Sequence, residues 1–341
     1  MKGKEIFALL IIFILGVSSN ALARDPKKVE NITLYFENDT FGGTDKDYTN
    51  AVKLTWTSAD IDEYSNGYSR KKVPLMGGLW GEEGYQRNFS FSIGQNIYTP
   101  ENTDAVELVE DERPYAGFLY TSFALHRKNI KMLDTLELTL GVIGPSSKAE
   151  DTQKFVHDLL DIDSPAGWDN QLGDELGIAL AWQRNWRAAA GGGGTGWGWD
   201  TIPYFGLTVG NIATFANAGL GVRFGYNIPL DFGTSLIRPA GAVPVPTNEA
   251  DPRLNEHRDF GIVWFVRAEG RAVAHNVFLD GSTFEDSHSV DKEHFVADLS
   301  AGISIIYKAV KLTYAQVHRT EEYEQQDSGH TFASIALSIT Y

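Results

Sequence analysis

The chain contains no cysteine among its 341 residues, which excludes a disulfide scaffold and zinc–thiolate sites. Basic residues are also in the minority, with 29 Lys and Arg against 45 Asp and Glu and a net charge of −16. This acidic balance argues against nucleic acid as a partner and is compatible with divalent cations. After the N-terminus, the sequence has no run approaching the ~20 apolar residues that a transmembrane helix requires.

Residues 1–23 have the features of a secretory signal peptide. Two lysines open the segment, residues 6–17 form an apolar core, and residues 21–23 (ALA) match a small-x-small cleavage site. The apolar core is shorter than the ~20 residues of a membrane-spanning helix, which disfavours the alternative of a retained anchor. We therefore expect residues 24–341 to form the mature protein, as a single domain.

The last ten residues, 332–341 (FASIALSITY), predict a strand with one apolar face. Successive side chains of a strand point to opposite faces; here the odd-numbered residues are Ala, Ile, Leu, Ile and Tyr, and the even-numbered ones are mostly small and polar. In the alternative, a soluble sandwich, an apolar edge strand at the C-terminus would invite aggregation. A barrel that closes its last strand onto its first has no edge, and a bilayer solvates its apolar exterior.

Short alternating runs separated by turn residues recur along the whole chain, about twelve in all, and an even number is what a bacterial single-chain barrel needs. The sequence therefore predicts an all-β protein, a transmembrane antiparallel β-barrel of about 12 strands in the bacterial outer membrane. Several tryptophans near run ends are expected to form an interfacial girdle, and the alternative is that they are ordinary core aromatics: Trp56, Trp182, Trp186, Trp197, Trp199 and Trp264.

Two segments depart from the strand pattern. Residues 148–161 predict a short helix in an extracellular loop region, with Phe155, Val156, Leu159 and Leu160 on one face. Residues 237–257 are rich in Pro and Gly and lack periodicity. We expect them to form a long extracellular loop, because the periplasmic turns of barrels are short.

His157 is the histidine with the best context for catalysis. It lies on the predicted helix beside Asp158, and Asp161 follows at i+4 on the same face. An imidazole with a carboxylate neighbour suits a general base, and the alternative is a solvated helix face. The other seven histidines have no obvious partner in the sequence.

Residues 37–50 are rich in Asn, Asp, Thr and Gly. Their oxygen ligands suit a hard cation such as Ca²⁺, and the alternative is a polar hairpin loop in which these are turn residues. No serine lies in a G-x-S-x-G context, so a hydrolase of this sequence would activate water rather than use a serine nucleophile.

Four segments together resemble the outer-membrane lipid A 3′-O-deacylases: residues 37–56, 112–120, 156–172 and 265–281. The resemblance covers essentially the whole mature chain in the same order. It implies a twelve-stranded barrel that removes 3′-linked acyl chains from lipid A in a Ca²⁺-dependent reaction. The implied partners are lipid A or lipopolysaccharide, the lipids of the outer membrane and the barrel-assembly machinery.

The resemblance also implies roles for single residues. Asp39 would hold Ca²⁺ with backbone carbonyls, and His157 would take a proton from water. Asn38 and Thr49 would orient the water or the ester carbonyl, and the family's acidic residue six positions after the histidine falls on Asp163.

The same resemblance places a phosphate-binding role on Arg113, which follows Glu112 in the segment ERPYAGFLY. Where relatives carry a basic residue before this arginine, phosphate binding would be weaker here. The alternatives to a deacylase are a passive barrel, such as a porin or adhesin, and an outer-membrane phospholipase.

Overall fold

A computed structural model describes residues 25–39, 47–61, 84–160, 164–192, 196–255 and 260–341. The expected signal peptide lies outside these residues. The described strands form one antiparallel sheet: β1 (Asn31–Asn38), β2 (Asp47–Thr57), β3 (Gln86–Thr99), β4 (Ala116–Lys128), β5 (Met132–Ile143), β6 (Glu175–Trp186), β7 (Ala189–Gly192), β8 (Trp197–Gly210), β9 (Ala213–Tyr226), β10 (Phe260–Asn276), β11 (Phe295–Tyr307), β12 (Val310–Arg319) and β13 (His330–Thr340).

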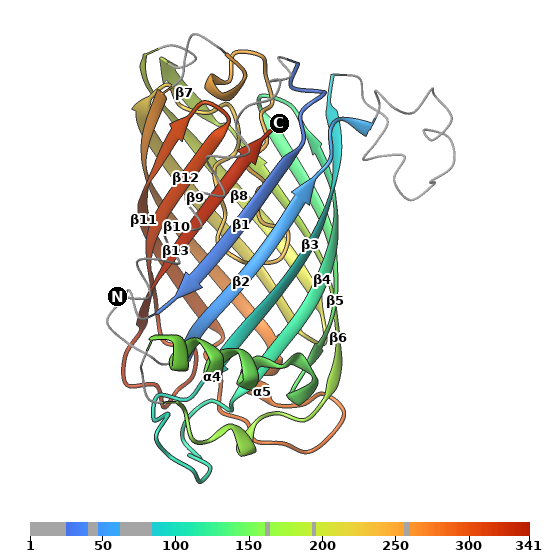
Figure 1. Ribbon diagram of the computed structural model, residues 1–341, viewed down its shortest axis with the longest axis vertical. Coiled ribbons are helices and arrows are strands. Elements are labelled where there is room, and N and C mark those ends of the chain that lie inside the picture. Colours follow the sequence, from blue (N-terminus) through green and yellow to red (C-terminus); the bar gives the residue numbers. More distant parts are fainter. Residues whose placement is uncertain (1–24, 40–46, 62–83, 161–163, 193–195, 256–259) are drawn as a thin grey trace.

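The sheet closes on itself at both ends of its strand order (Figure 1). The last strand β13 pairs with the first strand β1, from Asn31 opposite Thr340 to Asn38 opposite Ala333. On the other side β6 pairs with β8, while the four-residue β7 pairs with β8 alone. Twelve strands therefore form the wall, which confirms the predicted barrel and its closure. In the described part of the chain, no helix has the length and apolarity to cross a membrane.

The wall turns its apolar face outward, as the alternation predicts. In β13 the even residues from Ser334 to Thr340 are buried, whereas Ile335, Leu337 and Ile339 are only partly covered. The outer surface carries similar residues on the other strands, including Leu54, Ile93, Phe123, Leu180, Leu207, Val222, Val266, Leu299 and Leu312. Such an exterior requires an apolar medium, because contiguous apolar patches of this extent are rare on soluble monomers.

The expected tryptophan girdle lies on the outer face towards the end of the barrel that holds the C-terminus. Trp197 stacks on Phe224 with ring centroids 5.3 Å apart, and on Trp264 at 6.2 Å. On neighbouring strands, Trp182 and Trp186 lie 5.0 and 5.4 Å from the ring of Phe205. Rings that are half apolar and half polar favour the membrane interface.

The two ends of the barrel differ in their connections (Figure 1). Tight turns join β4 to β5 and β11 to β12 at the end that holds the C-terminus. Longer segments at the opposite end carry the helices α4 (Ala149–Leu160) and α5 (Val277–Asp280) and the 3₁₀ turns η3 (Pro145–Ser147) and η4 (Trp168–Asn170). Because short turns face the periplasm in such barrels, α4 and α5 lie at the extracellular end.

The segment between β9 and β10 differs from the prediction. It leaves and rejoins the wall at the short-turn end, so its expected extracellular placement is wrong. Its residues 227–255, including the 3₁₀ turn η5 (Pro252–Leu254), fold into the barrel. Phe232 packs against the inward-facing Leu133 and Ile202 in one buried cluster. Its Pro- and Gly-rich sequence has no strand period because it fills the lumen instead of extending the wall.

A buried charge cluster fixes this inserted segment, residues 227–255, to the wall. Asp231 is fully buried and lies 2.8 Å from Arg223 of β9, 2.8 Å from Lys311 of β12 and 3.1 Å from Arg253 within the segment. Burial alone would raise the pKa of Asp231, but the attraction of Lys311, Arg253 and Arg223 outweighs it and holds the pKa well below its ordinary value. The carboxylate therefore stays ionised inside the barrel.

Candidate active site

Asn38 and Thr49 lie together on the outer face of the wall. In β1 the odd residues are buried towards the lumen and the even ones point outward, which places Asn38 outside. In β2 the pairing with β3 skips one residue, because Tyr48 pairs with Tyr98 and Asn50 with Ile97. This β-bulge at Thr49 lets the threonine share the outer face with Asn50. Bulges often re-aim a side chain beside an active site.

Hydrogen bonds tie these residues to one another. The Asn38 side-chain amide donates to the Thr49 carbonyl over 3.0 Å, and the Asp39 backbone N–H points to the same oxygen at 3.4 Å. The Thr49 hydroxyl lies 2.6 Å from that of Thr99 on β3. Asp39 and Thr49 are both buried. Residues with hydroxyl, amide and carboxylate side chains are therefore joined by hydrogen bonds, and two of them are shielded from solvent.

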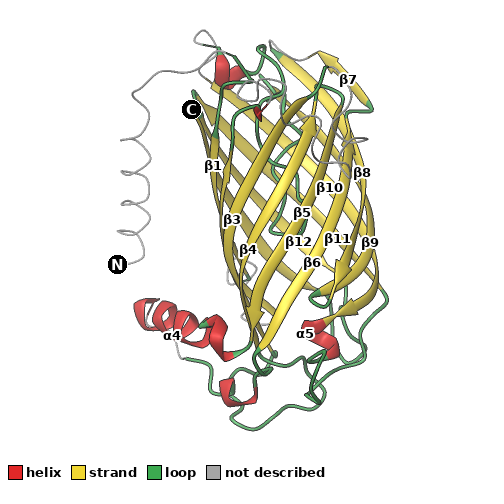
Figure 2. Cartoon of the chain, turned by 90° about the vertical axis from the view of Figure 1, so that its right-hand side faces the viewer, coloured by secondary structure: helices red, strands yellow, loops and turns green. Residues whose placement is uncertain are grey.

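Helix α4 lies outside the barrel at this same end (Figure 2). Its buried face consists of Ala149, Gln153 and His157, spaced four residues apart on one side of the helix. Phe155, which lies on the predicted apolar face of the helix, has 67% of its surface exposed. The side chains of Leu159 and Leu160 lie outside the described residues. Helix α4 thus turns its polar face to the barrel, because the medium around a barrel wall is apolar.

The start of α4 is held directly against β3 and β4. Ala149 shares a buried cluster with Ile97 of β3, Tyr115 and Trp168, and the Trp168 indole N–H donates to Gln153 over 2.9 Å. Gly117 of β4 is required at this contact, since a Cβ there would lie 2.2 Å from the Ala149 methyl group.

Through this contact α4 is placed beside the bulge. Ile97, which packs on Ala149, is the strand partner of Asn50, the residue after Thr49. His157 lies two helical turns beyond Ala149, and only 6% of its surface is exposed. Asp161 and Asp163 lie outside the described residues, so their roles stay predictions. The structure thus brings the start of α4 to the region of the outer wall next to Thr49 and Asn50, and His157 follows on the buried face of the same helix.

His275 has a carboxylate partner that the sequence did not indicate. Its Nδ1 lies 2.9 Å from Asp280 of α5, and its Nε2 lies 2.9 Å from the carbonyl oxygen of Asn211. Both ring nitrogens are therefore engaged by acceptors. This arrangement suits a structural link between β10, α5 and the β8–β9 turn better than proton transfer to a substrate.

Arg113 points away from solvent in this structure. It is 1% exposed, its guanidinium donates to Glu322 over 3.3 Å, and it lies 4.9 Å from the Tyr98 ring centroid. Burial alone would raise the pKa of Glu322, but Arg319 and Arg113 outweigh it and bring the pKa to about 2. A phosphate-binding role for Arg113 stays a prediction. Glu112 beside it accepts the backbone N–H of Asn102 over 2.9 Å.

The donors at the site are chemically suited to a hard cation. Asp39 has a buried carboxylate, and Asn38, Thr49 and Thr99, which belong to the same hydrogen-bonded group of residues, have neutral oxygens. Hard cations such as Ca²⁺ prefer oxygen ligands of this mixed kind. Within the described residues, no group of three or more acidic, His or Cys side chains forms a metal cluster, so Asp39 would be the principal charged ligand among them.

The sequence missed three residues that shape this site: Thr99, Gln153 and Glu37. Thr99 contacts Thr49 from the neighbouring strand, and Gln153 accepts a hydrogen bond from Trp168 of η4. No local sequence pattern indicates such contacts. Glu37 did leave a signal, because an ionisable residue at an inward position of a barrel strand needs buried partners.

Comparisons with known proteins agree with this architecture. A family model described as Outer membrane protein LpxR matches residues 7–341. Among solved structures, LpxR from Salmonella typhimurium superposes with a TM-score of 0.72 at 19% identity, covering 91% of this chain and 99% of that one. The β domain of the Bordetella autotransporter BrkA gives a TM-score of 0.42 at 9% identity, covering 92% and 97%. No curated protein matches the sequence.

Proposed function

Because this chain belongs to the LpxR family of outer membrane proteins, we propose that it is a lipid A deacylase that hydrolyses 3′-linked acyl esters at the outer leaflet. One observation supports this most: a buried histidine on a helix packed against the outside of the wall, at the level of a bulged threonine and an Asn-Asp pair. The outer wall is the face that a membrane lipid reaches. A reaction centre there can act on its substrate without drawing it into the lumen.

In the proposed reaction His157 accepts a proton from water, and the water oxygen attacks the ester carbonyl carbon. The bond to the sugar oxygen then breaks, and that oxygen takes the proton from His157 to give a hydroxyl, while the acyl chain leaves as a carboxylic acid. Asn38 and Thr49 orient the water and the carbonyl. A Ca²⁺ ion held by Asp39 would supply positive charge to stabilise the oxyanion when bound.

The alternatives predict different behaviour. A porin needs an open lumen, whereas residues 227–255 occupy this one. A phospholipase would cleave glycerophospholipids, so substrate specificity separates it from a deacylase.

The decisive experiment is mass spectrometry of lipid A from cells that express the protein, with and without a calcium chelator. We expect the wild type to remove the 3′ acyl chains from lipid A. The chelator should prevent this loss, and the Asp39→Ala variant should not cause it. Phospholipid cleavage with intact lipid A would support the phospholipase, and no cleavage of either lipid would support a passive barrel.

A further inference from the structure

We propose that Glu37 and Tyr48, on the lumen side of the wall, are positioning residues for the candidate active site on the outer side. This inference rests on the proposed function and extends it, because it assigns a role to groups that no substrate atom reaches. Glu37 precedes Asn38 in β1, and Tyr48 precedes Thr49 in β2. Each is thus one residue from a group of the site, on the opposite face of the same strand.

The geometry joins these two residues across the bulge. The Tyr48 hydroxyl donates to one oxygen of the Glu37 carboxylate over 2.9 Å, and both side chains are buried. Tyr48 lies beyond the point where the β2–β3 register shifts. Its bond to Glu37 therefore spans the extra residue, Thr49. This bond holds the bulge in the form that turns Thr49 outward.

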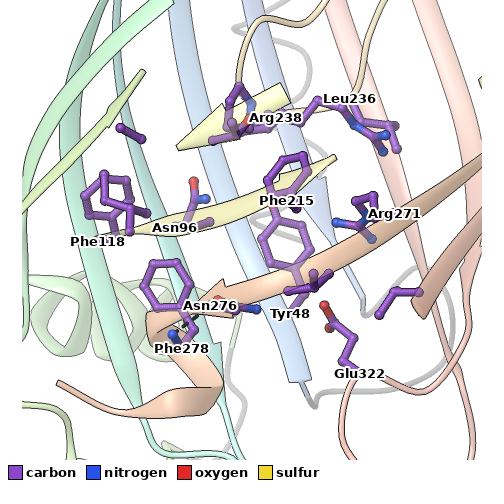
Figure 3. A pocket seen from close by; sticks show the side chains of 18 of the residues that line it. Tyr48, Asn96, Phe118, Phe215, Leu236, Arg238, Arg271, Asn276, Phe278 and Glu322 are labelled. Carbon is purple, nitrogen blue, oxygen red and sulfur yellow. Dashed lines mark hydrogen bonds between the residues drawn. The ribbon is translucent and has the colours of Figure 1, made fainter. Parts of the chain in front are cut away.

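The inserted segment provides the second anchor. The backbone N–H of Ile237 donates to the other oxygen of the Glu37 carboxylate over 2.8 Å. Arg238 follows and donates to Glu269 of β10 and, over 2.9 Å, to Asp298 of β11. Figure 3 shows Arg238 and Leu236 above Tyr48 in the cavity. Glu37 is thus fixed from the inserted segment as well as from β2.

Packing restrains Tyr48 further. Its ring lies 5.2 Å from that of Phe332 on β13 and 5.5 Å from that of Tyr98 on β3. Ala51, Leu236 and Val317 complete the same buried cluster. These contacts survive removal of the hydroxyl, so Tyr48→Phe deletes the bond to Glu37 with little loss of packing.

Neighbouring side chains of a strand are coupled in direction through the backbone. Because consecutive side chains point to opposite faces, a side chain fixed in the lumen fixes the direction of the next one outside. A misplacement of about 1 Å in a catalytic group can reduce a rate by about a hundredfold. The positions of Asn38 and Thr49 therefore depend on Glu37 and Tyr48.

The test compares Tyr48→Phe and Glu37→Gln with a matched control, Thr33→Val. Thr33 lies on the same strand and face as Glu37 and bonds to Asn31 over 2.7 Å and Ser338 over 3.2 Å, away from the site. Each purified full-length variant is assayed for kcat and KM on lipid A in detergent micelles. Heat-dependent gel migration and amide hydrogen exchange at residues 37–39 and 48–50 are measured in parallel.

We expect kcat to fall about tenfold or more in Tyr48→Phe and Glu37→Gln, with KM changed less than about twofold. Exchange at residues 48–50 should rise in both, while Thr33→Val changes neither quantity. Unchanged kcat and unchanged exchange in Tyr48→Phe would overturn the inference. If the wild type cleaves no lipid A, the proposed function fails, and the exchange data alone then decide whether Glu37 and Tyr48 hold the bulge.

Discussion

His157 lies on a helix outside the barrel, yet its side chain is buried. Burial of a polar imidazole costs free energy, and a catalytic role at the wall would explain this position. We predict that His157→Asn lowers ester cleavage by about 10²–10⁴-fold, the usual contribution of a general base. Folding should persist, because α4 lies outside the barrel. The measurement is lipid A analysis at matched levels of heat-modifiable protein.

The control for this variant is His294→Asn. His294 is exposed and contacts the carbonyl oxygen of Val273 over 3.1 Å, within the described part of the loop before β11. Its loss should leave cleavage unchanged. Near-normal release of acyl chains by His157→Asn would remove His157 from the mechanism.

The buried carboxylate of Glu322 predicts how the folding stability depends on pH. Its pKa is about 2 in the folded state against an ordinary value of 4.5. A lowered pKa means that the folded state favours the ionised form, so the stabilisation is complete above pH 4.5 and disappears as the pH falls towards 2. A shift of this size corresponds to about 3 kcal/mol.

We therefore expect Glu322→Gln to unfold more easily than the wild type at pH 7, and the difference in thermal stability to shrink between pH 4.5 and 2. Thermal unfolding in detergent across this pH range measures it. A difference that stays constant with pH would show that Arg113 and Arg319 do not stabilise the ionised carboxylate.

For single residues, the sequence predicted the chemistry of the side chains better than their contacts. The oxygen-rich run and the family resemblance pointed to Asn38, Asp39 and Thr49, and the structure places all three in one region. The bond between Thr49 and Thr99 was not predictable, because it depends on a one-residue shift in strand register. The alternation of side chains along a strand carries no information about such a shift.

Among the elements, α4 depends on its close approach to β4. We predict that Gly117→Ala displaces the helix, because the new methyl group would lie 2.1 Å from the Ser147 hydroxyl oxygen and 2.2 Å from the Ala149 methyl group. Cleavage should fall by about tenfold or more, since His157 moves with the helix. The barrel itself should still show heat-dependent migration.

The matched control is Gly270→Ala on β10, where an added Cβ meets no atom within 4 Å. It should leave both folding and cleavage intact. Equal activity of the Gly117 and Gly270 variants would mean that the position of α4 does not matter for the reaction.

Hydrophobic periodicity predicted the positions of several elements correctly. The helix was predicted over residues 148–161 and observed over Ala149–Leu160, and the alternation of the last strand was confirmed. The periodicity placed apolar side chains on one face of the helix but did not predict which face packs on the barrel. The usual rule assumes that apolar side chains pack on protein, but outside a membrane barrel the surrounding lipid is the apolar phase. Phe155 accordingly points away from the wall.

The molecule as a whole has an apolar exterior and a lumen that residues 227–255 occupy. The wall predicts a heat-modifiable protein that migrates faster unboiled than boiled and needs detergent for solubility. The even number of strands and the closure of the barrel were predictable because each strand has its own alternation of apolar and polar residues. The inserted segment was not, since it lacks periodicity and breaks the rule that periplasmic connections are short.

The anchor of residues 227–255 is open to a direct test. Asp231→Asn leaves Arg223, Arg253 and Lys311 without their shared carboxylate, and breaking a buried pair costs about 3–5 kcal/mol. We expect a lower unfolding temperature and the appearance of ion conductance in planar bilayers, because the segment loosens from the lumen. The wild type should not conduct.

Asp134→Asn is the control, since Asp134 also binds two arginines, Arg127 and Arg184, each within 2.6 Å, but lies on the outer face of the wall. It should lower stability without opening the lumen. Equal conductance in the two variants would show that Asp231 does not hold the segment in place.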